Sequence, residues 1–414
     1  MVNNQQGTGM KRFNIFYKTC IAIFSISAML SISYAAEDNL PEAFRGYQQD
    51  SKFIINYDDL NLILKNSVLV MGKSTRRLAQ SASSNIGTRF KNRVNRLTAN
   101  EGNRFYFEGF RKPEQQIILT KIRHSLEKLP SDAPLHFFSK EEQLAYWLNL
   151  YNVTMLEQLV KIYPRSSLKD ELTDSDGILN QKLLTVAGVK LSLNDIEYKI
   201  LMEKYNHDPL IIYGLYQGNI GGPNIRNQAY TGKNVYRSLE NNANEFINSN
   251  RGTYGNDKKY FRVSGFYKRN SAYFPNFKKD LTKHLLTYID GYTRRDLKNA
   301  HRIKANINDW KFTDLYGSMR KFGVGASTNK AALMSAVSNP IKGGGREGTM
   351  SGVGVADTEL VSNNILARTP DFGRFSQEQT ALIKQLVKNK RINTGQVTVT
   401  DLPDTKNDKS KDNK

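Results

Sequence analysis

The feature that most constrains this chain of 414 residues is its use of cysteine, because it contains only Cys20. Met10-Lys11-Arg12 opens a basic run, an apolar stretch continues to Leu30, and Ser33-Tyr34-Ala35 supplies two small residues. These features in this order predict a bacterial signal peptide over residues 1–35, whose removal on export also removes Cys20. The mature chain then has no disulfide, and its stability must come from a hydrophobic core.

We therefore expect a periplasmic or secreted protein. The alternative, an uncleaved N-terminal anchor, is disfavoured because the apolar stretch is short, and spanning a bilayer takes about 20 apolar residues. The sequence leaves open whether Met10 is the true start. No later apolar run in the mature chain is long enough to predict a transmembrane span.

Positive charge is the second constraint. Removing residues 1–35 lowers the 60 basic residues to 57 against 39 acidic ones, and basic residues gather between Lys73 and Lys112 and between Lys258 and Lys279. Such a surface attracts anionic envelope lipid, glycan or an acidic protein, and the alternative is a solvated basic face without a partner. Nucleic acid is a weak candidate because no recognisable binding motif accompanies the charge.

Composition and pattern divide the chain into five predicted parts. These are the signal peptide (1–35), a basic helical region (36–130), a core (131–250), a C-terminal extension of the core (251–334) and a Gly-rich, charged flexible tail (335–414). Within the tail a short helix is predicted over residues 376–390, and the polar end from residue 401 predicts disorder. The tail also contains a literal G-x-G-x-x-G from Gly343, which does not follow a strand and so predicts no nucleotide site.

The clearest predicted helix begins at Ser139-Lys140-Glu141-Glu142. This is a capping box, in which the serine and the glutamate each bind a free backbone N–H of the first turn. A second amphipathic helix is predicted over residues 116–129, ending at Pro130. Residues 210–217 predict a buried strand, and residues 303–312 a final strand. The mixture predicts an α+β fold, a helix-rich layer packed on a small mixed sheet.

Three segments together resemble the bacterial and plant family catalogued as domain of unknown function 547. They are Glu-Gln-Leu-Ala-Tyr-Trp-Leu-Asn-Leu-Tyr-Asn (142–152), Leu-Ser-Leu-Asn-Asp-Ile-Glu (191–197) and the stretch from Asp208-Pro209 to Ile225-Arg226. The resemblance covers roughly residues 135–250. The family has no agreed activity, and a papain-like or transglutaminase-like fold has been suggested for it.

The resemblance also locates a possible thiol site. The family carries a histidine early in its third segment and two cysteines around the glycine turn, where this chain has Ile212, Gln217 and Gly222. A thiolate nucleophile needs a cysteine and a base to activate it, so thiol catalysis is excluded for the mature chain. Whether the protein is an enzyme of another kind stays open.

The polar residues that are present have two interpretations. Glu142, Asn149 and Asn152 lie at offsets 0, 7 and 10, so they share one helical face, where they either hold loops by hydrogen bonds or line a cleft. Gln217 and Arg226 flank the glycine turn, whose backbone N–H groups could converge on an anion, although such turns are more often simply tight. Asn149, Asn152, Gln217 and Arg226 are therefore the candidate ligand-binding residues.

Catalytic candidates are few. Glu142 and Glu197 could form a carboxylate pair for acid–base chemistry, although the sequence does not set their separation. The five histidines are scattered without metal-ligand spacing, so we expect neither a metal site nor a cofactor. The sequence favours an exported, non-thiol binding or scaffold module for an anionic envelope partner. The alternatives are an envelope hydrolase or transferase that uses carboxylates or a serine, and an interaction protein that binds through its tail.

Overall fold

The computed structural model describes residues 39–79, 95–255, 260–315 and 373–393. The chain divides into two compact units, the first ending at Arg374 and the second beginning at Phe375. The second unit contains helix α13 (Gln377–Asn393), which confirms the helix predicted over residues 376–390. The predicted signal peptide, the G-x-G-x-x-G sequence and the end of the tail from residue 401 lie outside the described residues.

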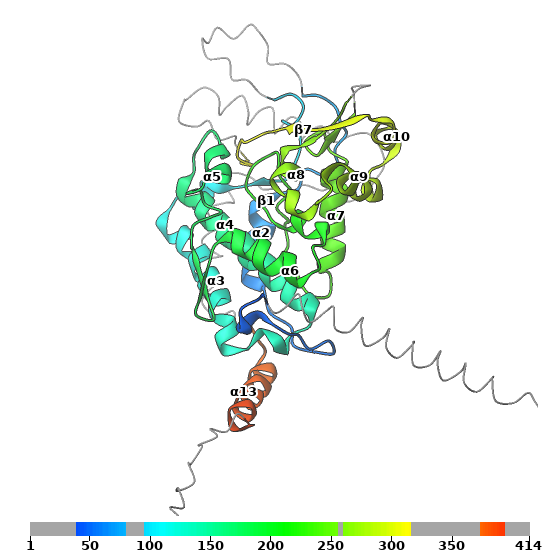
Figure 1. Ribbon diagram of the computed structural model, residues 1–414. Helices are drawn as coiled ribbons and strands as arrows, with labels where there is room; N and C mark the ends of the chain where they lie inside the picture. The colour runs from blue at the N-terminus through cyan, green and yellow to red at the C-terminus, as the bar shows by residue number, and fades with distance from the viewer. Residues whose placement is uncertain (1–38, 80–94, 256–259, 316–372, 394–414) are drawn as a thin grey trace, which may run out of the picture. The chain divides into compact units, whose positions relative to one another are not determined.

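Helix α4 (Lys140–Ile162) forms the centre of the first unit. Of its 23 residues 17 are buried, so it is enclosed on nearly all sides. It packs against α3 (Pro113–Asp132), and Figure 1 shows the two helices beside each other. The sequence predicted the end of α3 at Pro130, and this is wrong. Pro130 is tolerated in the last turn, and α3 ends at Asp132, where the Ala133 N–H donates to the Leu129 carbonyl at 2.8 Å.

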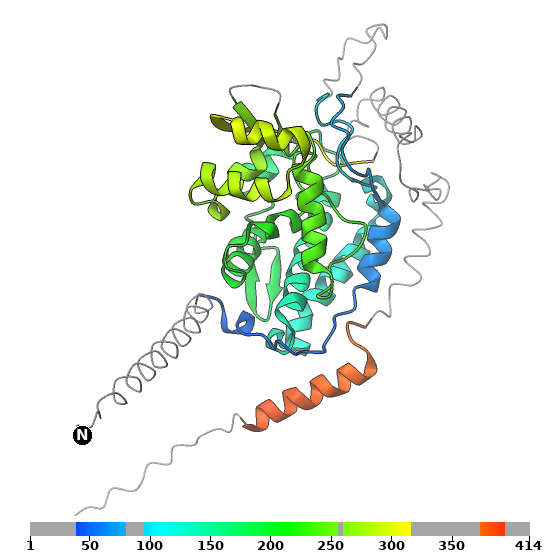
Figure 2. The same cartoon turned by 90° about the vertical axis from the view of Figure 1, so that its right-hand side faces the viewer.

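Shorter helical elements surround this pair, as Figures 1 and 2 show. None of the described helices has the combination of length and apolar character that crossing a membrane requires. The elements are η1 (Glu42–Phe44), α2 (Asp58–Ser67), η2 (Phe107–Phe110), η3 (Leu135–Phe137), α5 (Lys169–Thr173), η4 (Asp195–Leu201), α6 (Met202–Lys204), η5 (Pro209–Gly214), α7 (Val235–Ile247), α8 (Gly265–Arg269), η6 (Ser271–Tyr273), α9 (Phe277–Tyr288) and α10 (Gly291–Asn299).

The strands are short and form three small sheets. Two are antiparallel pairs, β1 (Val68–Leu69) with β2 (Arg104–Phe105) and β3 (Leu184–Val186) with β4 (Val189–Leu191). The third has the order β5 (Thr253–Tyr254), β6 (Tyr260–Ser264), β7 (Arg302–Ile307), with β5 antiparallel and β7 parallel to β6. Helix α8 packs on β6 and β7. The predicted α+β class, rich in helix with a small mixed sheet, is confirmed.

The strand predicted over residues 210–217 is wrong, because this run forms the 3₁₀-helix η5. The Asp208 carboxylate accepts from the Leu210 N–H at 2.9 Å, and Pro209 suits the first helical position. At the end of η5 the Gly214 carbonyl, and just after it the Tyr216 N–H, bond to the Asn152 side chain of α4 rather than to a strand. A short apolar run that is buried on every side has no period that separates strand from helix.

The final strand was predicted over residues 303–312 but ends at Ile307. Beyond it the chain turns towards the glycine turn, where the carbonyl of Asp309 accepts from the Gly221 N–H at 2.9 Å. Trp310 therefore lies outside the sheet, and its carbonyl accepts from the Leu168 N–H at 2.8 Å. The local sequence could not place this boundary because the bonds that set it come from residues about 90 to 140 positions away.

Candidate functional site

Glu142 connects α4 to two other segments of the backbone. Ser139 caps the helix as predicted, with its hydroxyl accepting from the Glu142 N–H at 3.2 Å, but the Glu142 carboxylate does not complete the box. One oxygen accepts from the Ile55 N–H and the other from the Gly232 N–H, both at 2.9 Å. Burial raises the pKa of this carboxyl, and the two N–H groups partly oppose the rise. Both oxygens are thus used to hold loops.

The two amides on the same face of α4 bond in the same way. Asn149 donates to the Tyr230 carbonyl at 2.8 Å and accepts from the Tyr230 N–H at 2.9 Å. Asn152 donates to the Gly214 carbonyl and accepts from the Tyr216 N–H, both at 2.9 Å. Each amide side chain therefore bonds to one backbone carbonyl and one backbone N–H, as a neighbouring strand would. A set of hydrogen bonds of this kind fixes loops in place and leaves these side chains little capacity for a ligand.

The glycine turn is filled by the protein's own groups. The Ile220 N–H donates to the Lys311 carbonyl and the Gly221 N–H to the Asp309 carbonyl, both at 2.9 Å. The Gly222 N–H donates to the Asn219 carbonyl at 3.1 Å. These three N–H groups are consequently not directed at an anion.

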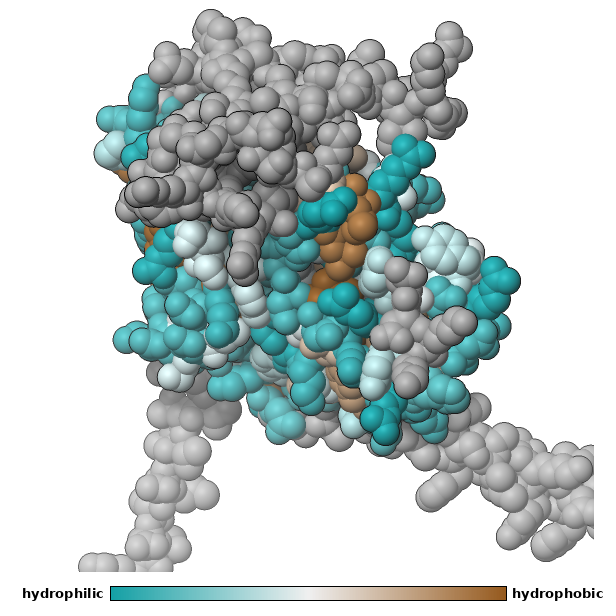
Figure 3. Space-filling model, turned by 90° about the horizontal axis from the view of Figure 1, so that it is seen from above, coloured by the Kyte–Doolittle hydropathy of each residue, from teal (hydrophilic) through white to brown (hydrophobic). Residues whose placement is uncertain are grey.

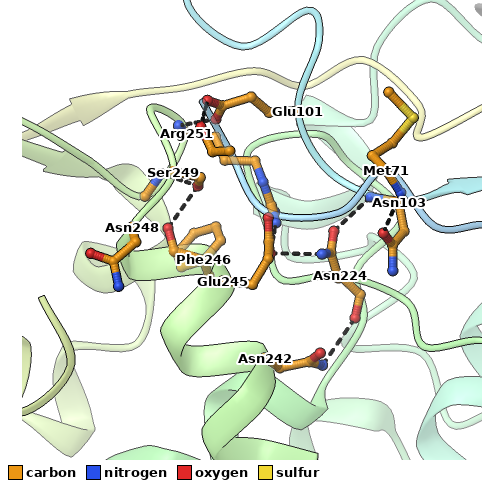
Figure 4. Close-up of polar contacts among 12 residues, drawn as sticks. Met71, Glu101, Asn103, Asn224, Asn242, Glu245, Phe246, Asn248, Ser249 and Arg251 are labelled. Atoms are coloured by element: carbon orange, nitrogen blue, oxygen red, sulfur yellow. Dashed lines mark hydrogen bonds and ion pairs between the residues drawn. The ribbon is translucent and has the colours of Figure 1, made fainter. Parts of the chain in front are cut away.

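Arg251 completes the turn from the other side. This arginine is 1% exposed, and its guanidinium donates to the Gly222 carbonyl and to Glu245. Figure 4 shows it between Glu245 and Glu101, whose carboxylate accepts from the Arg251 N–H at 2.9 Å. Asn224 extends the network by donating to Glu245 at 2.6 Å. Burial raises the pKa of Glu245, and the charge of Arg251 opposes that rise.

Arg226 lies at the edge of this network and is half-buried. Its guanidinium donates to the Ser238 carbonyl at 3.3 Å and lies 5.3 Å from the centre of the Tyr230 ring. Four tyrosines around the same block, which could either line a groove or fill the core, are all buried: Tyr205, Tyr213, Tyr216 and Tyr230. Their burial suits the core interpretation.

A separate group of polar residues surrounds Glu197. This glutamate is 1% exposed, and its Oε1 has no hydrogen-bond partner within the described part of the chain. It lies in η4, a π-helix, a rare element that often accompanies functional positions. Beside it are Tyr198 and the Arg269 guanidinium, which donates to the Gln217 Oε1 at 3.0 Å.

The electrostatics of this group are unusual. Burial raises the pKa of Glu197 to about 8, although the nearby positive charge of Arg269 opposes the rise. Burial also lowers the pKa of Arg269 to about 10, and the charge of Glu197 partly opposes this lowering. The pKa of Tyr151 is raised by burial and by the charge of Glu197. Glu197 is accordingly protonated at neutral pH, and strongly shifted groups of this kind are candidates for a functional site.

Apart from Arg226, which lies at the edge of the Arg251 network, the predicted residues divide between two places. Glu142, Asn149 and Asn152 bond to loop backbone, whereas Gln217 and Glu197 belong to one group with Arg269. Sequence reasoning missed Tyr151 and Arg269: the tyrosine is part of an apolar helix, and the arginine lies in a basic stretch with no distinguishing spacing. Within the described residues no cluster of three or more histidine, cysteine or acidic side chains could hold a metal ion.

The class of protein defined by this geometry is an α+β protein built around one enclosed helix, with loops held by inward polar side chains. The family model described as "Protein of unknown function, DUF547" matches residues 135–247, from η3 to the end of α7. This part of the chain is a domain of that family, as the resemblance indicated. No curated protein and no solved structure matches the chain, so a papain-like arrangement stays a prediction.

Proposed function

We propose that this chain is an exported binding or scaffold module that holds an anionic partner of the cell envelope. The partner that we favour is a membrane surface with anionic lipid headgroups, and the alternative partner is an anionic glycan or an acidic protein. The signal peptide predicted over residues 1–35 supports export to the periplasm or beyond. The proposal depends chiefly on one observation, the charge of the segment that follows the family domain.

That segment, residues 260–315, has 12 basic and five acidic residues. Most of the basic ones are exposed on α9, α10 and β7, which Figures 1 and 2 show at one end of the first unit. The exposed set is Lys268, Lys278, Lys279, Lys283, Arg294, Arg295, Lys298, Arg302 and Lys304. Each such residue near an anionic membrane contributes about 1 kcal/mol of attraction, so the set supports lipid binding.

The remainder of the molecule supports a scaffold role. The polar residues of α4, which would have to face a cleft in an enzyme, bond instead to loop backbone. The described surface seen in Figure 3 is mostly hydrophilic, with a strip of hydrophobic side chains crossing it. A rigid body with a charged outer face suits attachment to a polar surface.

Vesicle sedimentation tests this proposal. Purified protein that begins at residue 36 is mixed with phosphatidylglycerol vesicles or with neutral phosphatidylcholine vesicles at about 0.15 M salt. We expect binding to the anionic vesicles only, and a loss of binding as salt rises, because screening weakens surface charge interactions. If neither anionic vesicles nor anionic envelope glycan binds at this salt concentration, the proposal is wrong.

Glu197 favours a second candidate, an envelope hydrolase or transferase that uses a carboxylic acid. A glutamate with a pKa of about 8 is protonated at neutral pH and could act as a general acid. Glu142 is a poorer candidate because both its oxygens already accept hydrogen bonds from backbone. Release of soluble fragments from isolated envelopes, abolished in a Glu197→Gln variant, would support this candidate over the scaffold.

A further inference from the structure

The Arg269 guanidinium is fixed in place but only partly used. It lies 4.7 Å from the centre of the Trp310 ring and 5.9 Å from that of Phe266, and it donates to Gln217. Its Nε is buried and has no hydrogen-bond partner among the described residues. Stacking and one hydrogen bond therefore orient a cation whose Nε–H is left without an acceptor.

Two further buried groups beside this cation have an atom that is incompletely hydrogen-bonded. The Oε1 of Glu197 and the hydroxyl of Tyr151 are buried and have no hydrogen bond of good geometry within the described ranges, although Tyr198 lies beside the Glu197 carboxyl and Gln217 beside the Tyr151 hydroxyl. Both residues also interact electrostatically with Arg269. Glu197 and Arg269 also form no ion pair within 4.0 Å, unlike the buried Arg251 and Glu245. Buried polar groups are nearly always fully satisfied, so three incompletely bonded atoms in one place indicate a missing partner.

The chemistry of the three groups defines that partner. The guanidinium can only donate, and the tyrosine hydroxyl and a protonated Glu197 can each donate one hydrogen. A ligand that satisfies all three must bring acceptors, and a planar anionic group matches the edge of a guanidinium best. A cationic ligand would be repelled by Arg269, and an apolar one would leave the donors unpaired.

We infer that Arg269, Glu197 and Tyr151 form a binding site for the carboxylate group of a small molecule or a chain end. The outer edge of the site consists of Arg269, Tyr198 and Trp310, all half-buried. It is built jointly by the family domain and by the segment after it. The inference goes beyond the envelope-binding proposal and does not depend on it.

Binding at this site is coupled to the proton on Glu197. The side chains facing Glu197 are Tyr151 from α4, Tyr198 from η4, Tyr273 from η6 and Arg269. Arg269 is therefore the cation that stabilises an added negative charge here. Because the pKa of Glu197 is about 8, a carboxylate meets a neutral carboxyl below that pH and a second anion above it. Affinity should therefore fall as the pH rises past about 8.

Tryptophan fluorescence of the full mature chain tests the site. The chain has two tryptophans, of which Trp147 is fully buried while Trp310 contacts Arg269. The probes are N-acetylalanine, its uncharged amide, and inorganic phosphate. We expect a saturable change in emission with N-acetylalanine, little with the amide or phosphate, and none in a Trp310→Phe variant.

Arg262 offers a matched control for Arg269. It also lies against a ring, 5.9 Å from the centre of Tyr254, but its Nε donates to Asn306 at 2.9 Å. We expect N-acetylalanine to bind at least tenfold more weakly to Arg269→Gln and within twofold of the parent to Arg262→Gln. Equal affinities in the two variants would overturn the inference, as would equal binding of the amide. Binding of phosphate alone would overturn the carboxylate assignment.

Glu197→Gln provides a readout that does not depend on the folding of an Arg269 variant. The glutamine keeps a neutral side chain at every pH, so binding of N-acetylalanine should persist at pH 9. In the parent protein it should weaken about tenfold per pH unit above pH 8. If the two proteins show the same pH dependence, Glu197 is not part of the site.

Discussion

The family domain, residues 135–247, contains 11 basic and 13 acidic residues, whereas residues 260–315 contain 12 basic and five acidic ones. In the domain the polar side chains of α4 point inward and bond to loop backbone. In the following segment the charges are mostly exposed on α9, α10 and β7. The difference shows that polar groups in the domain stabilise the fold, whereas we propose that those of the following segment face a partner.

Removing an inward-facing charge should have the largest effect on stability. Arg251→Ala leaves Glu245 buried without its cation and the Gly222 carbonyl without a donor. We expect the free energy of unfolding to fall by about 3–5 kcal/mol, measured by urea denaturation. Arg262→Ala, from the basic segment, should change it by less than about 0.5 kcal/mol. Similar losses in both variants would contradict the distinction between inward-facing and outward-facing charges.

Truncating a loop-holding amide should cost somewhat less. Asn149→Ala leaves the N–H and carbonyl of the buried Tyr230 unpaired, so we expect a loss of about 2–4 kcal/mol in the same measurement. Asn306, an exposed residue of β7, is the matched asparagine, and its replacement by alanine should have almost no effect. A loss below about 1 kcal/mol for Asn149→Ala would mean that the hydrogen bonds between α4 side chains and loop backbone contribute little to stability.

The domain should also have a distinctive pH dependence. The folded state raises the pKa of Glu197 from 4.5 to about 8, so it binds this proton more tightly than the unfolded chain. The stability that results is fully present below about pH 4.5 and is lost as the pH rises to about 8, at no more than about 1.4 kcal/mol per pH unit. Glu197→Gln should flatten this part of a plot of unfolding free energy against pH. An unchanged slope would contradict the buried state of Glu197.

The basic segment should show the opposite pH dependence through His284 of α9. Burial lowers the pKa of His284 to about 4 from 6.5, and its Nε2 lies 2.9 Å from the Tyr213 hydroxyl. The unfolded chain takes up this proton first, so stability is fully present above about pH 6.5 and declines as the pH falls towards 4. His284→Gln should remove that decline in acid unfolding experiments, and a persistent decline would assign it to other groups.

Exposed charges should have the smallest effect on stability and a clear effect on binding. Reversing Lys278 and Lys279 to glutamate should change the free energy of unfolding by less than about 0.5 kcal/mol but weaken sedimentation with anionic vesicles several-fold. The same reversal at Lys169 and Lys190, which are exposed in the family domain, is the control. If both pairs weaken binding equally, net charge rather than the basic segment drives the interaction.

Much of the local structure was predictable. The cap at Ser139 and the helix that it begins depend on neighbouring residues, and the structure contains both. The strand predicted over residues 210–217 failed because a short buried run is stabilised in whichever form its distant neighbours satisfy. Here those neighbours include Asn152 and Asn242, which bond to the backbone of η5 and of the residues after it.

The amino-acid sequence by itself determined the family domain, the α+β class and the choice of polar residues worth following. Only the tertiary structure decided what those residues do: Glu142 binds Ile55 and Gly232 rather than its own helix. It also brought Arg269, from outside the matched domain, beside Glu197. The physical reason is that caps and turns are set by neighbours along the chain. The partner of a buried polar group is set instead by whichever segment, near or far in sequence, the packing brings within hydrogen-bond distance.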